Sequence, residues 1–185
     1  MTQIKRRSII CILLALLPAG FTGIRAATGT RTAVGGWFSS KGSGLVFLFS
    51  HSDGTYGELR VSADFDQLLN GRESFPGFRA QYGYNMRLAT VTISDELKIR
   101  PVAGPGITVG YVRDHEKGMG ILAALDGNLG LEFIFPASPL SIYAGISAEV
   151  GAHIVLRNRY ESTMTLYDNG LRRIWQPELS VRYRF

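Results

Sequence analysis

The feature that most limits the possible folds of this chain is a strict alternation of side chains between residues 140 and 154. Apolar residues occupy every even position from Leu140 to Ile154, and mostly polar or small residues occupy the odd positions. An amphipathic helix repeats its apolar positions every three and four residues, so this run is not helical. Strands of soluble proteins usually have ~5–6 residues, whereas a tilted strand needs ~9–11 residues to cross a bilayer. The run therefore favours a strand of a membrane-spanning β-barrel.

The same alternation recurs along most of the chain, with turn signals between the runs. Short turns are predicted at residues 52–55, 94–96 and 136–139, and longer polar connections at 39–43, 67–77, 114–120 and 155–172. Three short turns that alternate with four longer loops define eight strands, and short turns belong on the periplasmic side of a membrane barrel. The strands are expected near residues 30–38, 44–51, 56–66, 78–92, 98–113, 121–135, 140–154 and 173–185.

The predicted fold class is therefore all-β, an eight-stranded antiparallel up-and-down transmembrane β-barrel. Two features fit it poorly. Pro101 and Pro105 lie in the fifth strand, where a closed barrel has no free edge for a residue without an N–H group. Residues 160–167 alternate weakly, as either an extension of a strand above the membrane or a ninth strand that would change the count.

The first 26 residues have the layout of a secretory signal peptide. Three basic residues, Lys5 to Arg7, precede an apolar run over residues 8–17, and Ile24-Arg25-Ala26 forms a cleavage signal. The apolar run is shorter than the ~20 residues that a spanning helix needs. We therefore expect residues 1–26 to be removed after export, leaving residues 27–185 as one barrel domain.

Loss of the signal peptide changes what the composition implies. Four of the 20 Lys and Arg residues lie within it, so 20 − 4 = 16 basic residues face 15 acidic ones in the mature chain. This balance gives no support to nucleic-acid binding. Cys11, the single cysteine, also leaves, so no disulfide, thiolate metal site or thiol nucleophile is expected. Three scattered His residues lack metal-ligand spacing, and we expect no cofactor.

The final strand, which ends in Leu179-Ser-Val-Arg-Tyr-Arg-Phe185, resembles those of the small eight-stranded outer-membrane barrels, the OmpX/OmpA-like group. The stretch from Gly127 to Tyr143, with its short Pro turn, resembles uncharacterised barrels of Bacteroidetes-type bacteria. This resemblance implies a porin-like protein in the outer membrane of a Gram-negative cell, in contact with its lipid and lipopolysaccharide. It also implies recognition by the barrel-assembly machinery, through a signal formed by Leu179, Val181, Tyr183 and Phe185. It implies no substrate.

Charged residues of both signs recur on the predicted inner face of the strands. An eight-stranded barrel is just wide enough for side chains to fill its interior, and unpaired buried charges are unfavourable. We therefore expect a paired network that fills the barrel, although the same residues would line a narrow pore if they stayed unpaired. The predicted network comprises Glu58, Arg60, Asp64, Arg79, Arg87, Lys98, Arg100, Asp126, Glu132, Glu149, His153, Glu178, Arg182 and Arg184.

Ser147, Glu149 and His153 share the inner face of one strand and have the residue types of a hydrolytic triad. At ~3.3 Å per residue, Glu149 and His153 are about 13 Å apart along the strand, too far for a direct hydrogen bond in most rotamers. A histidine in a polar interior is the simpler interpretation. No catalytic residue is therefore assigned, and a lipid-modifying outer-membrane enzyme is kept as an alternative function.

Aromatic residues near the predicted strand ends are expected to form the girdles of a membrane barrel. An ordinary solvated loop is the simpler interpretation of residues 155–172, and contact of the arginines in and just beyond it with lipopolysaccharide phosphates is the functional alternative. The function favoured by the sequence is a structural or surface-interaction role, with no indication of an extracellular ligand. The predicted girdle comprises Trp37, Phe38, Phe78, Tyr111, Phe133, Phe135, Tyr143, Trp175, Tyr183 and Phe185, and the loop arginines are Arg157, Arg159, Arg172 and Arg173.

Overall fold

The computed structural model describes residues 32–52, 54–65, 76–114, 118–158, 161–168, 170 and 175–185, without the side chains of 156–158 and 161–162. The predicted signal peptide, residues 1–26, lies outside these ranges, as do the side chains of the four loop arginines. Among the described residues, no helix is both long and apolar enough to span a membrane.

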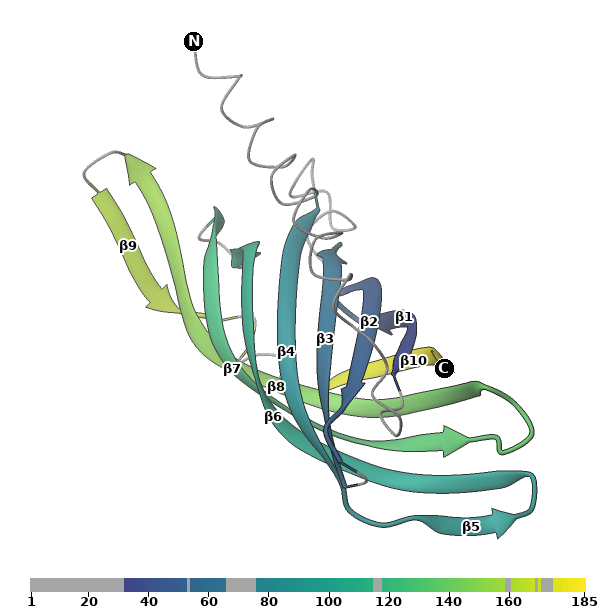
Figure 1. Ribbon diagram of the computed structural model, residues 1–185. Helices are drawn as coiled ribbons and strands as arrows, with labels where there is room; N and C mark the ends of the chain where they lie inside the picture. The colour runs from purple at the N-terminus through teal and green to yellow at the C-terminus, as the bar shows by residue number, and fades with distance from the viewer. Residues whose placement is uncertain are drawn as a thin grey trace. The chain divides into compact units, whose positions relative to one another are not determined.

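The described part of the chain forms ten strands (Figure 1). Several are longer than the sequence pattern predicted, because the alternation continues into the polar connections. The strands are β1 (Ala33–Ser39), β2 (Gly42–Ser50), β3 (Thr55–Asp64), β4 (Gly77–Arg87), β5 (Val91–Ser94), β6 (Leu97–Asp114), β7 (Gly118–Ile134), β8 (Leu140–Asn158), β9 (Glu161–Leu166) and β10 (Gln176–Arg184).

Antiparallel pairing closes the sheet into a barrel. The neighbours follow the order β10-β1-β2-β3-β4-β6-β7-β8, and β10 also pairs with β8. The wall therefore has the eight strands, all antiparallel and in up-and-down order, that the turn pattern predicted. β5 and β9 add no further wall strands, because β5 pairs with β6 and β9 pairs with β8.

Paired residues followed once around the barrel lead back to β8 at a different position along that strand. From Gly36, pairing through β10 leads to Ile142, whereas pairing through β2, β3, β4, β6 and β7 leads to Ala152. The two positions differ by 152 − 142 = 10 residues, which is the shear of the barrel. A shear of this size in eight strands requires strongly tilted strands, as in other closed barrels.

The weakly alternating segment at residues 160–167 contains β9, which does not change the number of strands in the barrel wall. β8 pairs with β10 as far as Ser147 and with β9 from Ala152 onward. β9 and β10 thus follow each other along the same edge of β8. The predicted fourth strand is interrupted in a similar way, since β4 and β5 both pair with β6 on either side of residues 88–90.

Both prolines of the fifth wall strand lie inside β6. Pro101 and Pro105 keep their register opposite β7. On the other side, the ladder between β4 and β6 passes from Gly83 to Met86 without pairing the two residues between them. Tyr84 and Asn85 would lie opposite Pro105 and Gly104 in this register. The sheet thus accommodates the missing N–H of Pro105 by an interruption in one ladder rather than by an early strand end.

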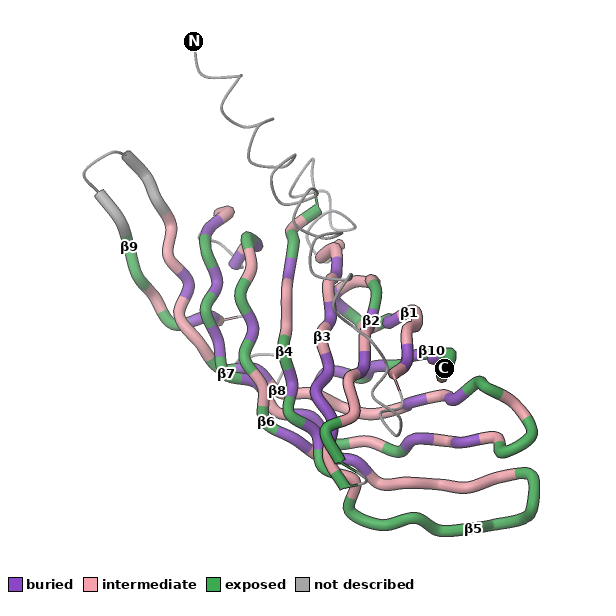
Figure 2. The backbone as a smooth tube through the Cα atoms, in the orientation of Figure 1, coloured by how far each residue is buried: buried purple, intermediate pink, exposed green. Residues whose placement is uncertain are grey.

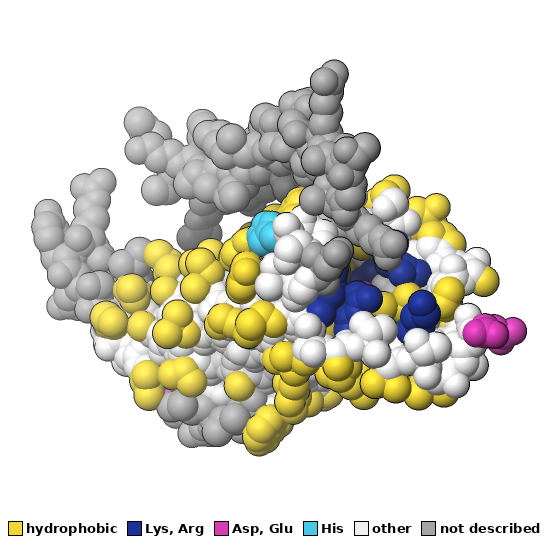
Figure 3. Space-filling model, turned by 60° about the horizontal axis from the view of Figure 1, so that its bottom comes forward, with side chains coloured by type: hydrophobic (Ala, Val, Ile, Leu, Met, Phe, Trp, Pro, Cys, Tyr) yellow, Lys and Arg dark blue, Asp and Glu magenta, His cyan; other side chains and the backbone are white. Residues whose placement is uncertain are grey.

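Burial alternates along the wall, as period-2 side chains require (Figure 2). In β7 the even positions from Leu122 to Asn128 are buried, whereas Leu125 is 70% exposed. The outward positions carry large apolar side chains, which cover much of the surface seen in Figure 3, while Lys and Arg gather in a hollow of that face. The apolar side chains of this exterior include Phe38, Leu45, Phe78, Tyr82, Ile107, Val109, Tyr111, Leu129, Val150, Leu179 and Val181.

Polar side chains thus face inward and apolar side chains face outward, the reverse of a soluble barrel. Such an exterior is unfavourable in water and favourable in lipid, and the pairing of β10 with both β1 and β8 closes the barrel wall. The barrel is therefore built to span a membrane.

Candidate functional site: the charged interior of the barrel

Glu178 is the centre of one interior network. Its carboxylate accepts hydrogen bonds from Arg60 Nη1 at 2.5 Å, Trp37 Nε1 at 3.2 Å and Tyr143 Oη at 3.1 Å. Arg60 also pairs with Glu58, and Glu58 accepts a bond of 3.1 Å from Arg182 Nη2. We call Glu58, Arg60, Glu178 and Arg182 the Glu178 network. All four side chains are nearly inaccessible to solvent.

The Glu178 network crosses the inside of the barrel. Glu58 and Arg60 belong to β3, and Glu178 and Arg182 belong to β10, with β1 and β2 between them in the wall. Their side chains therefore meet through the interior and not along the sheet. Because each charge has an opposite charge beside it, burial of the four groups is compensated.

Glu149 is the centre of a second network. Its Oε2 accepts hydrogen bonds from Arg79 Nη1 at 2.8 Å and from Lys41 Nζ at 3.2 Å. Arg79 Nε donates to Asp64 at 2.9 Å, and Arg79 Nη2 donates to the hydroxyl of Tyr167. We call Lys41, Asp64, Arg79 and Glu149 the Glu149 network. It also crosses the interior, because Arg79 lies on β4 and Glu149 on β8, with β6 and β7 between them.

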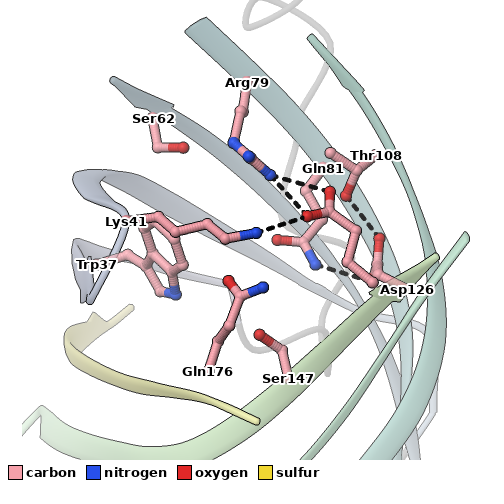
Figure 4. A pocket seen from close by; sticks show the side chains of 10 residues that line it. Trp37, Lys41, Ser62, Arg79, Gln81, Thr108, Asp126, Ser147 and Gln176 are labelled. Carbon is pink, nitrogen blue, oxygen red and sulfur yellow. Dashed lines mark hydrogen bonds and ion pairs between the residues drawn. The ribbon is translucent and has the colours of Figure 1, made fainter. Parts of the chain in front are cut away.

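A small polar cavity of about 30 Å³ lies beside the Glu149 network (Figure 4). Asp126 is at its edge, where Gln81 Nε2 donates to it at 2.8 Å and Thr108 Oγ1 donates at 2.7 Å. About 10–15 Å³ suffices for one water molecule, so the cavity has room for one or two. Its lining consists of Trp37, Lys41, Ser62, Arg79, Gln81, Thr108, Asp126, Ser147, Glu149 and Gln176.

The other predicted interior residues lie closer to the ends of the barrel or outside the two networks. Arg100 approaches Glu132 at 3.6 Å and is partly exposed. Arg87 lies over the Tyr56 ring at 4.8 Å and donates to the Ser52 carbonyl. Lys98, near the start of β6, is only half-buried.

Two predicted interior residues have other partners than the predicted network. Arg184 is bound to the turn between β7 and β8, where its Nη2 donates to the carbonyls of Phe135 at 3.1 Å and Ser138 at 2.8 Å. His153 is fully buried, and its Nε2 pairs with the Val112 carbonyl at 3.0 Å. Neither side chain belongs to the Glu178 or the Glu149 network.

Several residues that lie inside the barrel were not predicted there from the sequence. The sequence pattern assigns Lys41 to a polar loop, and nothing in it places this residue inside. Trp37 and Tyr143 are predicted in the lipid-facing girdle, but they are 7% and 1% exposed and bind Glu178. Tyr143 lies between Ile142 and Ala144, which belong to the apolar face of the strand, so the alternation alone would have predicted that it points inward.

The three residues considered as a hydrolytic triad do not combine. Glu149 is bound by Arg79 and Lys41, and His153 pairs with a backbone carbonyl. Ser147 lines the cavity, and the structure shows no hydrogen bond between it and His153. Within the described ranges, no three His, Cys, Asp or Glu side chains gather closely enough to hold a metal ion.

Lys41 lies in the turn between β1 and β2, outside the strands. Burial, reinforced by the nearby charge of Arg79, lowers the pKa of Lys41 from 10.5 to about 8, against the opposing effect of Glu149. Between these two values the unfolded chain holds a proton on Lys41 that the folded protein has lost. In this window, the free energy of unfolding therefore rises with pH.

A Lys41→Met variant should show this contribution. As the pH increases from about 8 towards 10.5, native stability should rise relative to the variant by up to about 1.4 kcal/mol per pH unit. Below pH 8 the difference between the two should be constant. Urea unfolding in detergent micelles measures both curves. If the free energies of unfolding of the two proteins change in parallel between pH 8 and 10.5, Lys41 keeps its ordinary pKa.

Comparisons with known proteins identify the fold. No family model matches the chain, and no curated protein matches its sequence. The structure is similar to the N-terminal β-barrel domain of OprF from Pseudomonas aeruginosa, with a TM-score of 0.50, 12% identity and coverage of 84% of this chain and 96% of that one. A major outer membrane protein of Thermus thermophilus gives a TM-score of 0.50 at 12% identity, over 85% of this chain and 100% of that one. Neisserial surface protein A gives 0.44 at 13% identity, over 84% and 95%. The two structures with a TM-score of 0.50 show the fold, that of an outer-membrane β-barrel.

Proposed function

We propose that this protein is an integral outer-membrane barrel with a filled polar interior, and that its role is structural or in interactions at the cell surface. The observation that carries the proposal is the pair of charge networks that cross the interior. Arg60 joins Glu178 in one, and Arg79 joins Glu149 in the other. Side chains that meet across the barrel fill the space that an open pore would need.

The location in the outer membrane is supported by the closed barrel, its apolar exterior and the similarity of its fold to outer-membrane barrels. In this membrane, the β2–β3, β5–β6 and β7–β8 turns face the periplasm, and the β1–β2 turn and the β8–β9 hairpin face the outside. Contact between the loop arginines and lipopolysaccharide stays a hypothesis from the sequence. The narrower resemblance to barrels of Bacteroidetes-type bacteria stays a prediction.

Membrane fractionation tests the proposal. The protein should be found in the outer-membrane fraction and should migrate faster in a gel before boiling than after, because a closed barrel stays compact in detergent. Recovery as a soluble protein with no change in migration would contradict it.

Two other functions are weaker candidates. A lipid-modifying enzyme would need a nucleophile joined to a base, and Ser147 and His153 are not joined. If lipid A from cells with and without the protein is identical, the enzyme is excluded. A narrow pore would need an interior that ions can cross, and the two networks oppose this.

We also propose that β10 carries the signal read by the barrel-assembly machinery. Leu179, Val181, Tyr183 and Phe185 all point outward, and the Tyr183 and Phe185 rings meet edge to face at 5.1 Å. Replacing Phe185 with Ser should lower the fraction of heat-modifiable protein several-fold, whereas Leu88→Ser, an exposed apolar change outside β10, should not. Equal assembly of both variants would remove this role.

A further inference from the structure

Positively charged side chains collect at the end of the barrel where β4 and β10 end and β6 begins. They occupy inward-facing positions, in step with buried residues such as Asn85 of β4 and Val102 of β6. Figure 3 brings the end with β5 forward and shows Lys and Arg gathered in a hollow of that face. We call these side chains the basic mouth, and they are Arg87, Lys98, Arg100 and Arg184.

Three members of the basic mouth lie on neighbouring strands. Arg87 of β4 is paired with Val102 of β6, and Arg100 is the next position on the same face of β6. Lys98 follows on that face and is paired with Thr92 of β5. Successive positions on one face of a strand are roughly 7 Å apart. One small ligand can therefore reach Lys98 and Arg100 together.

Arg184 belongs to the same rim, although its strand lies further round the wall. Its Nη2 donates to the carbonyl of Phe135 at 3.1 Å, in the turn after β7. Lys98 is paired with Ile134, the residue before Phe135. The basic mouth thus follows the rim of the barrel from β4 to the turn between β7 and β8.

Within the residues that the structure describes, Lys98 and Arg100 keep donors for a ligand. Lys98 is half-buried, and no described side chain forms a hydrogen bond or ion pair with it. Arg100 donates one hydrogen bond to a described residue, from Nε to Thr90 Oγ1 at 3.2 Å. Glu132, opposite Arg100 in the ladder, approaches its Nη1 at 3.6 Å. The acidic residues of the turn beyond β5, Asp95 and Glu96, are exposed outside the strands.

A buried arginine lies beneath the basic mouth. Arg182 is inaccessible to solvent, and its Nη2 and Nε donate to Glu58 and Ser180. Its Nη1 makes no hydrogen bond with the described residues. Ser141, which is paired with Arg182, donates to Glu132 at 3.4 Å, so this arginine lies close to the mouth. Buried donors without a partner are rare, and Nη1 marks a place where an acceptor oxygen is lacking.

We propose that the basic mouth binds a phosphate group, with Lys98 and Arg100 as its direct contacts. A guanidinium offers paired donors that match phosphate oxygens, and an ammonium group adds a compact positive charge. A phosphate monoester carries about −1.5 to −2 charge at neutral pH. This charge suits a rim on which, among the described residues, four cations face one inward carboxylate, that of Glu132. The Glu178 network closes the barrel behind the mouth, so the site is a blind end and not a passage.

The basic mouth opens to the periplasm because it lies at the β5–β6 and β7–β8 turns, so its compartment rests on the proposed function. Asp95→Cys, in the exposed β5–β6 turn, checks this orientation. The natural Cys11 lies in the predicted signal peptide, so the new thiol is unique in the mature chain. It should react with a bulky maleimide only after the outer membrane is permeabilised. Reaction on intact cells would overturn the periplasmic assignment, whereas binding is measured separately on the purified protein.

Titration calorimetry of the purified, refolded protein with pyrophosphate tests the site, in a maltoside detergent that carries no phosphate. We expect binding whose affinity falls as the salt concentration rises. Lys98→Gln should weaken it at least about fivefold, because a charge-assisted hydrogen bond is lost. Lys98→Arg, which keeps the charge, should bind pyrophosphate like the native protein. Since Lys98 holds no described side chain in place, both variants should keep heat-modifiable migration.

Arg113→Gln is the matched control, because it removes one positive charge from the same strand at the other end of the barrel. It should leave the affinity for pyrophosphate unchanged. Absence of binding by the native protein would overturn the proposal. An equal loss of affinity in Arg113→Gln, or no loss in Lys98→Gln, would also overturn it.

The phosphate can come from a phospholipid head group at the rim or from a soluble compound. Phosphatidylglycerol added to the micelles distinguishes the two sources, with the same molar fraction of oleate as a control for surface charge. If phosphatidylglycerol but not oleate displaces pyrophosphate, the site takes a lipid head group. If neither displaces it, the site takes a soluble phosphate compound. Equal displacement by both would show attraction to any anion and would contradict a phosphate site.

Discussion

Replacing Glu178 with Ala should lower the free energy of unfolding by about 3–5 kcal/mol, because it leaves a buried arginine with too little opposite charge. Glu178 is inaccessible to solvent and accepts bonds from Arg60, Trp37 and Tyr143 at once. Loss of the carboxylate removes the acceptor of all three donors. Urea unfolding in detergent micelles, followed by the migration of folded and unfolded protein, measures the change.

Two matched variants separate the unpaired charge from the loss of side-chain volume. The double variant Arg60→Met with Glu178→Leu removes both charges and keeps the interior filled, so it should recover most of the lost stability. Glu96→Ala, in the exposed turn between β5 and β6, should change the free energy of unfolding by less than about 0.5 kcal/mol. If Glu178→Ala behaves like Glu96→Ala, the Glu178 network does not hold the barrel together.

The second large effect is expected in ion conductance. Alanine at Arg60, Glu178, Arg79 and Glu149 removes one opposite pair from each network and should produce stepwise openings in a planar bilayer. Each pair crosses the interior, and an eight-stranded barrel has room for little besides its own side chains. Because both members of each pair are removed, the variant leaves fewer uncompensated charges than single replacements would.

Four alanine replacements on the lipid-facing side make the matched control, since they remove a similar number of side chains without touching the interior. This control should stay silent in the bilayer. A silent interior variant with native heat-modifiable migration would mean that other side chains close the barrel. The control positions are Ile107, Leu125, Leu129 and Val150.

The wall of the barrel follows from local sequence pattern. The alternation that starts at Leu140 predicts one strand directly, and β8 extends it to Asn158. Turn chemistry separates the strands, and antiparallel neighbours joined by turns pair in order. The breaks between β4 and β5 and between β9 and β10 were not predictable in this way, because they depend on the register with β6 and β8 rather than on the residues at the break.

The sequence predicted interior residues only where their inward direction follows from alternation along a strand. Arg60, Arg79, Glu149 and Glu178 alternate with apolar residues, so their inward direction is visible in the sequence. Their partners are not, because pairing across the barrel depends on shear and side-chain length. Lys41 enters from a turn and Tyr167 from a break between strands, where period-2 reasoning does not apply.

The barrel of the unaltered protein should be closed to ions. Single-channel recording of the purified, refolded protein in a planar bilayer measures it. We expect insertion without resolvable openings over the voltages that a bilayer tolerates, because the Glu178 and Glu149 networks both close the barrel. Stable, voltage-independent openings of the native protein would contradict it and would identify a pore.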